Sequence, residues 1–207
     1  GHTGILQYVI LQSKNIISND FLLSYCQKNS KLGVHPDYGN PGIEASTGSL
    51  GHGLGLAVGI AYAEKLKRSK IKTFVLLSDG ELQEGSTWES LMMAANLKLE
   101  NLFIFIDHNG SQSFGKTIEI HPKFYPISTK LRSFNINCLN INGHSYKDFS
   151  KIYKKILKKN TTPTCIICNT IKGNGVSFME NDPIWHYRSP NKEEYFSAIE
   201  SINKKYI

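Results

Sequence analysis

The chain has 207 residues, of which 40% are hydrophobic and 20% charged, a composition typical of a globular domain with a sizeable core. No stretch approaches the roughly 20 apolar residues that a membrane-spanning helix needs, so we expect no membrane partner. The net charge of +7 is interpreted as a lysine-rich solvated surface, because no aromatic platform or recognised motif indicates a nucleic-acid site.

Helical and strand patterns alternate along the chain. The spacing of apolar residues predicts helices over residues 3–12, 19–28, 53–67, 86–97, a stretch that begins near Pro122, 147–159 and 192–203. Four short apolar runs predict buried strands over residues 73–77, 102–106, 134–141 and 164–169, and a Gly-, Pro-, Ser- and Thr-rich stretch predicts an ordered loop over 34–55. This alternation favours an α/β fold, a parallel sheet with helices on both faces. Since no linker or repeat is visible, we expect one domain over residues 1–207.

Four sparse cysteines are compatible with a reducing cytoplasm, which is the expected location. Cys165 and Cys168 lie three apart in a predicted strand, so their side chains should point to opposite faces. No second Cys/His pair at zinc spacing accompanies them, and we interpret both as buried strand residues. The first residue is Gly1 and not Met, so we expect the domain to be truncated at its N-terminus.

A polar residue followed by glycine stands shortly after each of two predicted strands. These pairs are Asp79-Gly80 and Asn109-Gly110. Ligands of open α/β sheets bind beyond the carboxyl ends of the strands, where the two pairs would converge if the strands are neighbours. A carboxylate, an amide oxygen and a backbone carbonyl make half of an octahedral Mg²⁺ shell, and phosphate oxygens and water usually complete it. Asp-Gly and Asn-Gly are also common turn sequences, so the pattern alone leaves both interpretations open.

Longer segments carry a family resemblance. Asp79-Gly80, followed by a predicted helix and strand and then Asn109, resembles the thiamine-diphosphate motif. The segments LLSDGELQEGSTWES, HPDYGNPGIEASTGSLGHGLGLAVGIA, IKGNGVSFMEN and IWHYRSPNKEEY resemble the transketolase family, in particular the N-terminal subunit of split transketolases. The resemblance runs from Gly1 to about Tyr195. It implies the thiamine-diphosphate-binding fold and the transfer of a two-carbon ketol unit from a ketose, such as a ketose phosphate, to an aldose.

The resemblance also implies a cofactor site. Asp79 and Asn109 match side-chain ligands of Mg²⁺, or of another divalent cation such as Ca²⁺ or Mn²⁺, and Ser111 matches a ligand through its carbonyl. Gly80 matches a glycine whose amide contacts the diphosphate, and Glu81 follows it in the same segment. The other residues implied at the cofactor are Gly48, Ser49 and Leu50, at the aminopyrimidine and thiazolium, and His186 at the diphosphate.

Catalytic roles are implied for four side chains. His2 and His35 match histidines near the cofactor and substrate, and His186 matches one that reaches both. Imidazoles of this kind can move protons to and from sugar hydroxyls. Glu84 matches a carboxylate at the subunit interface that is linked to the activating glutamate of the other subunit.

The sequence departs from the family pattern in three places, one of which is the absence of the residues upstream of Gly1, where the family has another histidine. Ser78 replaces the first glycine of the motif, which puts the turn at the diphosphate in question. Tyr187 follows His186 where the family usually has glycine, which would reshape the substrate entrance.

The family match ends without a pyrimidine-binding domain. We therefore expect a separate C-terminal subunit to be the partner, a dimer of heterodimers, and an isolated chain that is inactive. Three alternatives stay open: the alpha subunit of a 2-oxoacid dehydrogenase, a relative of deoxyxylulose-phosphate synthase, and a non-catalytic subunit that has lost cofactor binding. His35-Pro36 and Gly48-Ser49-Leu50 favour transketolase over the first.

Overall fold

The structure is a computed structural model that describes residues 1–113, 115–158 and 160–206. Its backbone divides into two compact units, residues 1–53 and 54–207. Each unit has its own apolar core and is described by itself. The single domain expected from the sequence stays a prediction.

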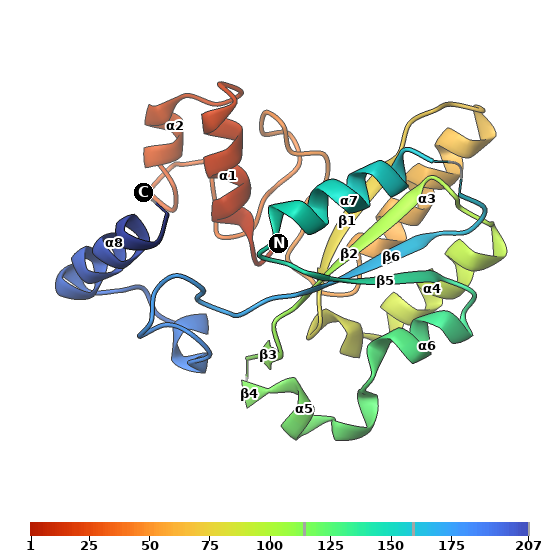
Figure 1. The fold of residues 1–207 in the computed structure, drawn as a ribbon. Helices are drawn as coiled ribbons and strands as arrows, with labels where there is room; N and C mark the ends of the chain where they lie inside the picture. The colour runs from red at the N-terminus through yellow and green to blue at the C-terminus, as the bar shows by residue number, and fades with distance from the viewer. Residues whose placement is uncertain (114, 159, 207) are drawn as a thin grey trace. The chain divides into compact units, whose positions relative to one another are not determined.

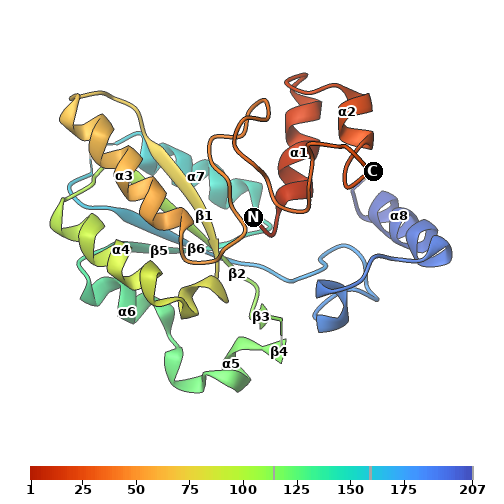
Figure 2. The ribbon, with the colours of Figure 1, turned by 180° about the vertical axis from the view of Figure 1, so that it is seen from behind.

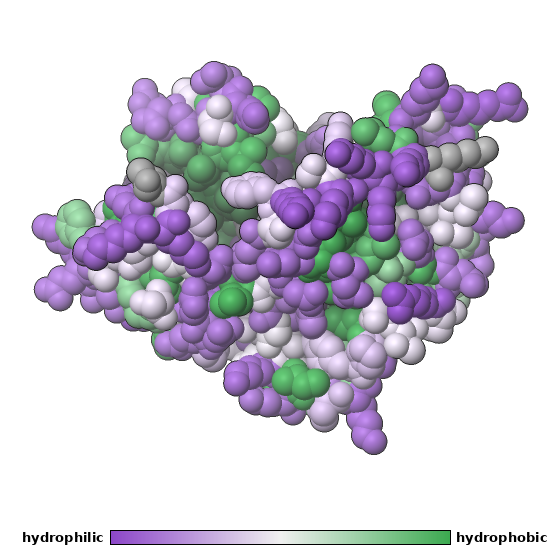
Figure 3. Space-filling model, in the orientation of Figure 1, coloured by the Kyte–Doolittle hydropathy of each residue, from purple (hydrophilic) through white to green (hydrophobic). Residues whose placement is uncertain are grey.

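The N-terminal unit contains two helices, α1 (Gly4–Ser13) and α2 (Asn19–Leu23), and a long loop that leads to α3. Tyr8, on α1, is fully buried in the core of this unit, and its hydroxyl donates to the carbonyl of Gly33 at 3.1 Å. The unit exposes apolar side chains over the α1–α2 region (Figure 3). Its buried core consists of Tyr8, Leu11, Ile17, Leu32 and Ile43.

Helix α2 is shorter than the predicted helix over 19–28. It begins at Asn19, after the N-cap residue Ser18, whose hydroxyl accepts a hydrogen bond from the amide of Phe21 at 3.1 Å. It ends at Leu23, and Cys26 then adopts a φ of +55°, a left-handed conformation that cannot continue a helix. The stretch that follows has no helix or strand before Gly53, as predicted for the loop over 34–55 up to the start of α3.

The second unit is built on four parallel strands in the order β1-β2-β6-β5 (Figure 1). The strands are β1 (Thr73–Ser78), β2 (Leu102–His108), β5 (Asn137–Asn142) and β6 (Thr164–Asn169). Residues 103–106 are apolar on both faces of β2, and this is why an apolar run without alternation predicts a buried strand here.

Helices cover both faces of this sheet, which confirms the predicted α/β fold. Helices α3 (Gly53–Leu66), α4 (Gly85–Asn96) and α6 (Ile127–Ser133) pack with Leu77, Ile104 and Ile106 on one face. Helix α7 (Tyr146–Ile156) packs through Ile152 and Ile156 against Phe103 and Ile166 on the other. Figure 2 shows α3 and α4 in front of the sheet, with α7 behind it.

The predicted helix that begins near Pro122 is broken into pieces. Two short segments replace it, η2 (Pro122–Phe124) and α6, and a further short helix, α5 (Thr117–Ile120), precedes them. Pro122 and Pro126 lack the amide donor that a continuous helix needs. The next strand begins at Asn137 and not at residue 134, because Asn135 adopts a φ of +61° in the turn before it.

The remaining elements lie near the carboxyl ends of the strands or near the C-terminus. A short 3-10 helix, η1 (Glu81–Gln83), follows β1, and a two-stranded antiparallel ribbon, β3 (Ser111–Gln112) and β4 (Gly115–Lys116), follows β2. Segment η3 (Pro183–His186) precedes α8 (Lys192–Tyr206), which extends beyond the predicted 192–203.

The second unit also tests the predictions for the two strand cysteines and for the helix over residues 147–159. Cys165 and Cys168 are buried in separate cores on opposite faces of the sheet, as strand alternation predicts. The predicted helix over 147–159 ends at Ile156, and Lys159 lies outside the described residues. Within the described ranges, no helix combines the length and the apolar character needed to cross a bilayer.

Candidate functional site

The tips of β1 and β2 lie side by side. Ser78 and Asp107 are partners in the parallel register, so Asp79 leaves β1 beside the end of β2. One carboxylate oxygen of Asp79, Oδ2, accepts a hydrogen bond from the amide of Gly110 at 2.7 Å. The other, Oδ1, accepts from the amide of Gly80 at 2.9 Å. The structure therefore brings Asp79 into contact with the loop that carries Asn109 and Ser111.

Asp79 is a buried carboxylate with little to balance its charge. Its side chain is 0% exposed, and burial raises its pKa from 3.8 to about 6, although the Gly110 and Gly80 amides and the nearby His108 oppose the rise. Among the described residues, no lysine or arginine forms an ion pair with it. A bound cation would favour the ionised form that burial disfavours.

The loop after β2 is held by its own polar side chains. Asn109 donates through Nδ2 to Asp107 Oδ2 at 2.9 Å, and its Oδ1 accepts from the amide of Ser111 at 2.9 Å. The hydroxyl of Thr170, just after β6, donates to the other oxygen of Asp107. Asp107 thus joins the ends of β2 and β6. The sequence predictions give it no role, although an aspartate directly after an apolar strand was the available signal.

The turn after β1 shows how Ser78 serves in place of glycine. Its hydroxyl accepts a hydrogen bond from the amide of Glu81 at 3.1 Å and so closes the turn that starts η1. Gly80 has an ordinary helical φ of −62°, but an added Cβ would lie 3.4 Å from Cβ of Gln112. Since 3.4 Å is an ordinary van der Waals distance, neither space nor backbone conformation requires glycine here. The Gly80 amide already donates to Asp79, so a diphosphate would have to share it.

The donor set at the two tips fits a hard divalent cation. A carboxylate or amide oxygen that accepts one hydrogen bond keeps a second lone pair, so Asp79 and Asn109 can still coordinate. No cluster of three or more His, Cys, Asp or Glu side chains suited to a metal occurs in the part of the chain that the structure describes. A cation here would depend on an amide, a carbonyl and ligand oxygens, as Mg²⁺ with a bound phosphate does.

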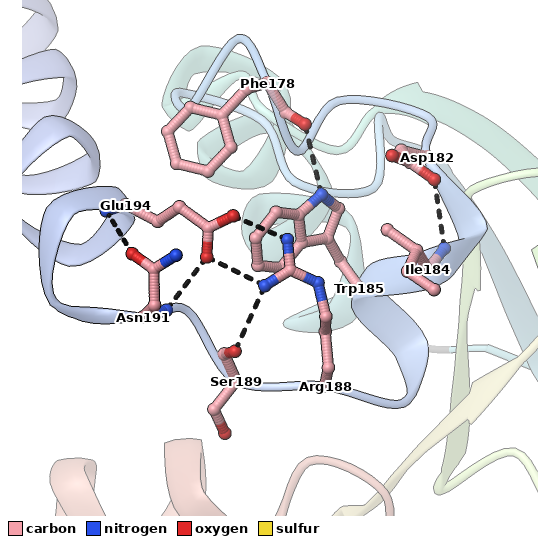
Figure 4. Close-up of polar contacts among 8 residues, drawn as sticks. All are labelled: Phe178, Asp182, Ile184, Trp185, Arg188, Ser189, Asn191 and Glu194. Atoms are coloured by element: carbon pink, nitrogen blue, oxygen red, sulfur yellow. Dashed lines mark hydrogen bonds and ion pairs between the residues drawn. The ribbon is translucent and has the colours of Figure 1, made fainter.

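His186 belongs to a segment that precedes α8. Burial, and then the charge of Lys172, lower the pKa of its imidazole, so the neutral form is favoured at pH 7. The segment is fixed by Trp185, whose indole donates to the carbonyl of Phe178 at 3.1 Å (Figure 4). The neighbouring Tyr187 donates through its hydroxyl to the carbonyl of Ser113, in the loop after β3.

The N-terminal unit brings three of its expected site residues together. The rings of His2 and His35 lie 5.1 Å apart between centroids, and His35 Nδ1 lies 3.0 Å from the carbonyl of Gly1. Gly48 has a φ of +145°, and an added Cβ would lie 2.8 Å from Cδ2 of His35. Ser49 and Leu50 follow directly, and the Leu50 carbonyl lies 3.1 Å from Nδ1 of His52.

Glu84 and Glu81 lie apart from the hydrogen bonds made by the Asp79 carboxylate. Glu84 is exposed at the start of α4, where its backbone accepts from the amide of Thr87 at 3.2 Å. Glu81 is buried in η1, two residues after Asp79. An exposed carboxylate at the end of a helix suits an interface better than a metal shell.

Comparison with known proteins settles the family. Residues 1–200 match the model described as "Transketolase, thiamine diphosphate binding domain". The chain belongs to the transketolase N-terminal family. It is 36% identical over 205 residues to an apulose-4-phosphate transketolase subunit of Phocaeicola vulgatus, covering 99% of this chain and 73% of that protein. It is 39% identical over 203 residues to the subunit of the same name from Actinobacillus succinogenes, covering 98% and 73%.

A solved transketolase from Campylobacter jejuni has the same fold. It superposes with a TM-score of 0.90 at 29% identity, over 98% of this chain and 33% of that one. The family match confirms the predicted resemblance to the N-terminal part of transketolases and supports a transferase that binds thiamine diphosphate. The two relatives are each named as one subunit of their enzyme, which implies a partner subunit. The roles of individual site residues stay predictions.

Proposed function

We propose that this chain is the diphosphate-binding subunit of a transketolase-type enzyme that transfers a two-carbon ketol unit from a ketose phosphate to an aldose. The observation that carries the proposal is the contact between Asp79 Oδ2 and the Gly110 amide at 2.7 Å. It draws a buried carboxylate and an amide side chain to one edge of the sheet, where phosphate ligands of open α/β folds bind. Family membership supports thiamine diphosphate as that ligand.

In this proposal Asp79, Asn109 and the Ser111 carbonyl hold Mg²⁺, and Gly80 offers its amide to the diphosphate. When bound, thiamine diphosphate supplies a thiazolium ring that accepts the electrons of the broken carbon–carbon bond. Asp79 would hold the cation, and its two amide donors keep the carboxylate in place. Since the carboxylate is buried, water competes poorly for the cation on its protein side.

The histidines would act on protons of the sugar. His186 has a lowered pKa, so at neutral pH its imidazole is ready to accept a proton from a hydroxyl. His2 and His35 form a second pair of imidazoles in the N-terminal unit, with one nitrogen of His35 engaged by the Gly1 carbonyl. We propose that each of the three contacts the donor or acceptor sugar.

A partner subunit is supported by exposed apolar side chains on α3. Leu56 and Ile60 are 48% and 49% exposed, and the exposed Gly59 between them has open space around its Cα. Contiguous exposed apolar patches mark protein interaction sites. We propose that the pyrimidine-binding domain of a separate C-terminal subunit covers this face in a cytoplasmic dimer of heterodimers. Glu84, exposed at the start of α4, would lie at the same interface.

The names of the two relatives indicate a class of substrate but no particular sugar for this chain. The two relatives are named for apulose-4-phosphate, a phosphorylated sugar. We propose a phosphorylated ketose donor for this chain and leave the sugar open.

The test combines binding and turnover. The chain, the C-terminal partner and their mixture are titrated with thiamine diphosphate and Mg²⁺ by calorimetry, and then assayed with ketose phosphates and with 2-oxoacids. We expect Mg²⁺-dependent binding and ketol transfer by the mixture, and no turnover by the chain alone. Turnover of 2-oxoacids would favour the dehydrogenase alternative. If the mixture of the two subunits did not bind thiamine diphosphate, the non-catalytic alternative would be favoured.

A further inference from the structure

Tyr187 connects two segments that are far apart in sequence. Its hydroxyl donates to the carbonyl of Ser113, 74 residues earlier, in the loop that begins with Ser111. Its ring meets the ring of His186 edge-on, with centroids 5.0 Å apart. The ring is 62% exposed, so the side chain extends over the surface and is engaged at its polar tip. One residue thus contacts both the expected catalytic histidine and the loop of an expected metal ligand.

The segment that carries Tyr187 is anchored on its other side. The Arg188 guanidinium lies 3.9 Å above the Trp185 ring and binds both carboxylate oxygens of Glu194 at 2.7 and 2.6 Å (Figure 4). Glu194 Oε2 also accepts from the amide of Asn191 at 2.8 Å. The segment is therefore fixed to α8, and Tyr187 is its link to the strand tips.

The loop at the far end of this link is equally fixed. The Asp79 carboxylate holds the Gly110 amide at 2.7 Å, and Asn109 Oδ1 holds the Ser111 amide at 2.9 Å. Two residues further on, the Ser113 carbonyl receives the Tyr187 hydroxyl. The backbone around Ser111 is thus held from both sides, which fixes the direction of the Ser111 carbonyl.

We propose that Tyr187 is a positioning residue that ties the His186 segment to the Ser111–Ser113 loop, so that the imidazole and the cation ligands keep one arrangement. This role rests on the proposed function. Through this hydrogen bond, a shift of the Ser111–Ser113 backbone would move the His186 segment directly, with no rearrangement of the apolar core. Both the affinity for the Mg²⁺–cofactor complex and the affinity for the sugar donor then depend on one hydroxyl group.

The decisive variant is Tyr187→Phe, which removes the hydroxyl and keeps the ring. A net hydrogen bond is worth about 0.5–1.5 kcal/mol, so its loss should change the dependent equilibria about 2- to 10-fold. Tyr195→Phe is the matched control, because Tyr195 is also an exposed tyrosine, on α8. The first measurement is amide hydrogen exchange of the cofactor-free chain over residues 110–113 and 184–187.

We expect exchange in both segments to become about 2- to 10-fold faster in Tyr187→Phe, with the melting temperature lowered by only a few degrees and no effect of Tyr195→Phe. With the partner subunit, Tyr187→Phe should raise the cofactor Kd and the donor KM by a similar factor and leave kcat nearly unchanged. Unchanged exchange, or faster exchange with unaltered Kd and KM, would overturn the positioning role. Failure of the wild-type pair to bind the cofactor would overturn the proposed function itself, which separates the two outcomes.

Discussion

The Asp79 carboxylate of one strand tip accepts the Gly110 amide of the next at 2.7 Å. This contact joins a side chain after β1 to the backbone after β2, so the relative position of the tips is fixed by the chain itself. The loop with Asn109 and Ser111 is held by contacts within the chain. Preorganisation of this kind lowers the entropic cost of binding.

Asp79→Asn should abolish Mg²⁺-dependent cofactor binding. The substitution removes the negative charge and replaces one coordinating oxygen with a donor that cannot bind a cation. We expect Kd to rise at least about 100-fold in calorimetry with the partner subunit, since even supporting residues of metal sites change affinity 10- to 100-fold. Glu89→Gln, an exposed carboxylate on α4, is the control. A Kd within a few-fold of wild type would exclude Asp79 as a ligand.

Cofactor binding should weaken as the pH falls below about 6. Burial raises the pKa of Asp79 from 3.8 to about 6, and the carboxyl must lose its proton before it can bind a cation. We expect Kd to rise by roughly tenfold per pH unit below that value. Titrating Mg²⁺ against free thiamine diphosphate over the same range corrects for protonation of the cofactor. A corrected Kd that stays level would contradict the assignment.

Because of the same carboxyl, the cofactor-free chain should have a lower free energy of unfolding at neutral pH than at about pH 4. Its folded pKa lies above the unfolded value, so its stabilising contribution is complete below pH 3.8 and is lost as pH rises through about 6. The loss amounts to roughly 3 kcal/mol at most. In urea unfolding, the free-energy difference between Asp79→Asn and wild type should therefore shift in favour of the variant on going from about pH 4 to about pH 7.5. If the difference in unfolding free energy between the variant and wild type did not change with pH, burial of the Asp79 carboxyl would not raise its pKa.

Gly48→Ala should disturb the histidine pair of the N-terminal unit. Gly48 has a φ of +145°, and the new methyl group would meet His35 at 2.8 Å. We expect a loss of roughly 1–3 kcal/mol in the free energy of unfolding and altered ring shifts of His2 and His35 by NMR. Gly39→Ala is the matched control, because Gly39 has a φ of +97° with no atom within 4 Å. If both variants moved the ring shifts equally, backbone strain and not the His35 contact would be the cause.

Ile60→Glu should separate the chain from its partner subunit without unfolding it. Ile60 is exposed on α3, so a charge there costs little in the free chain but is buried at the proposed interface. Apolar anchors at interface centres contribute about 2 kcal/mol or more, so we expect binding to weaken at least about 30-fold by analytical ultracentrifugation. Tyr153→Glu places the same charge on the exposed face of α7 and should have no effect. Equal weakening by both variants would rule out a specific α3 interface.

The sequence predicted the sheet well because its central strands are buried on both faces. The run Phe103–Ile106 is apolar throughout, and such runs followed by Asp, Asn and Gly mark strand tips in α/β folds. The errors at the end of α2 and before β5 have one physical cause. Cys26 and Asn135 adopt positive φ values, which local apolar spacing does not reveal.

The contacts that organise the site were beyond sequence reasoning because they join distant segments. Thr170 reaches Asp107 across 63 residues, and Tyr187 reaches Ser113 across 74. Neither pair has a local pattern that sets it apart from turn residues. The motif around Asp79 was visible because its partners are held at fixed spacing by one helix and one strand.

Glu194 serves two elements at once, since its carboxylate binds the Arg188 guanidinium while it accepts the Asn191 amide at the start of α8. Fraying of the first turn of α8 therefore removes one of the two contacts that hold the Arg188 guanidinium, the other being the indole of Trp185. Unwinding of the C-terminal helix should therefore alter the surroundings of this indole, one of the two tryptophans of the chain.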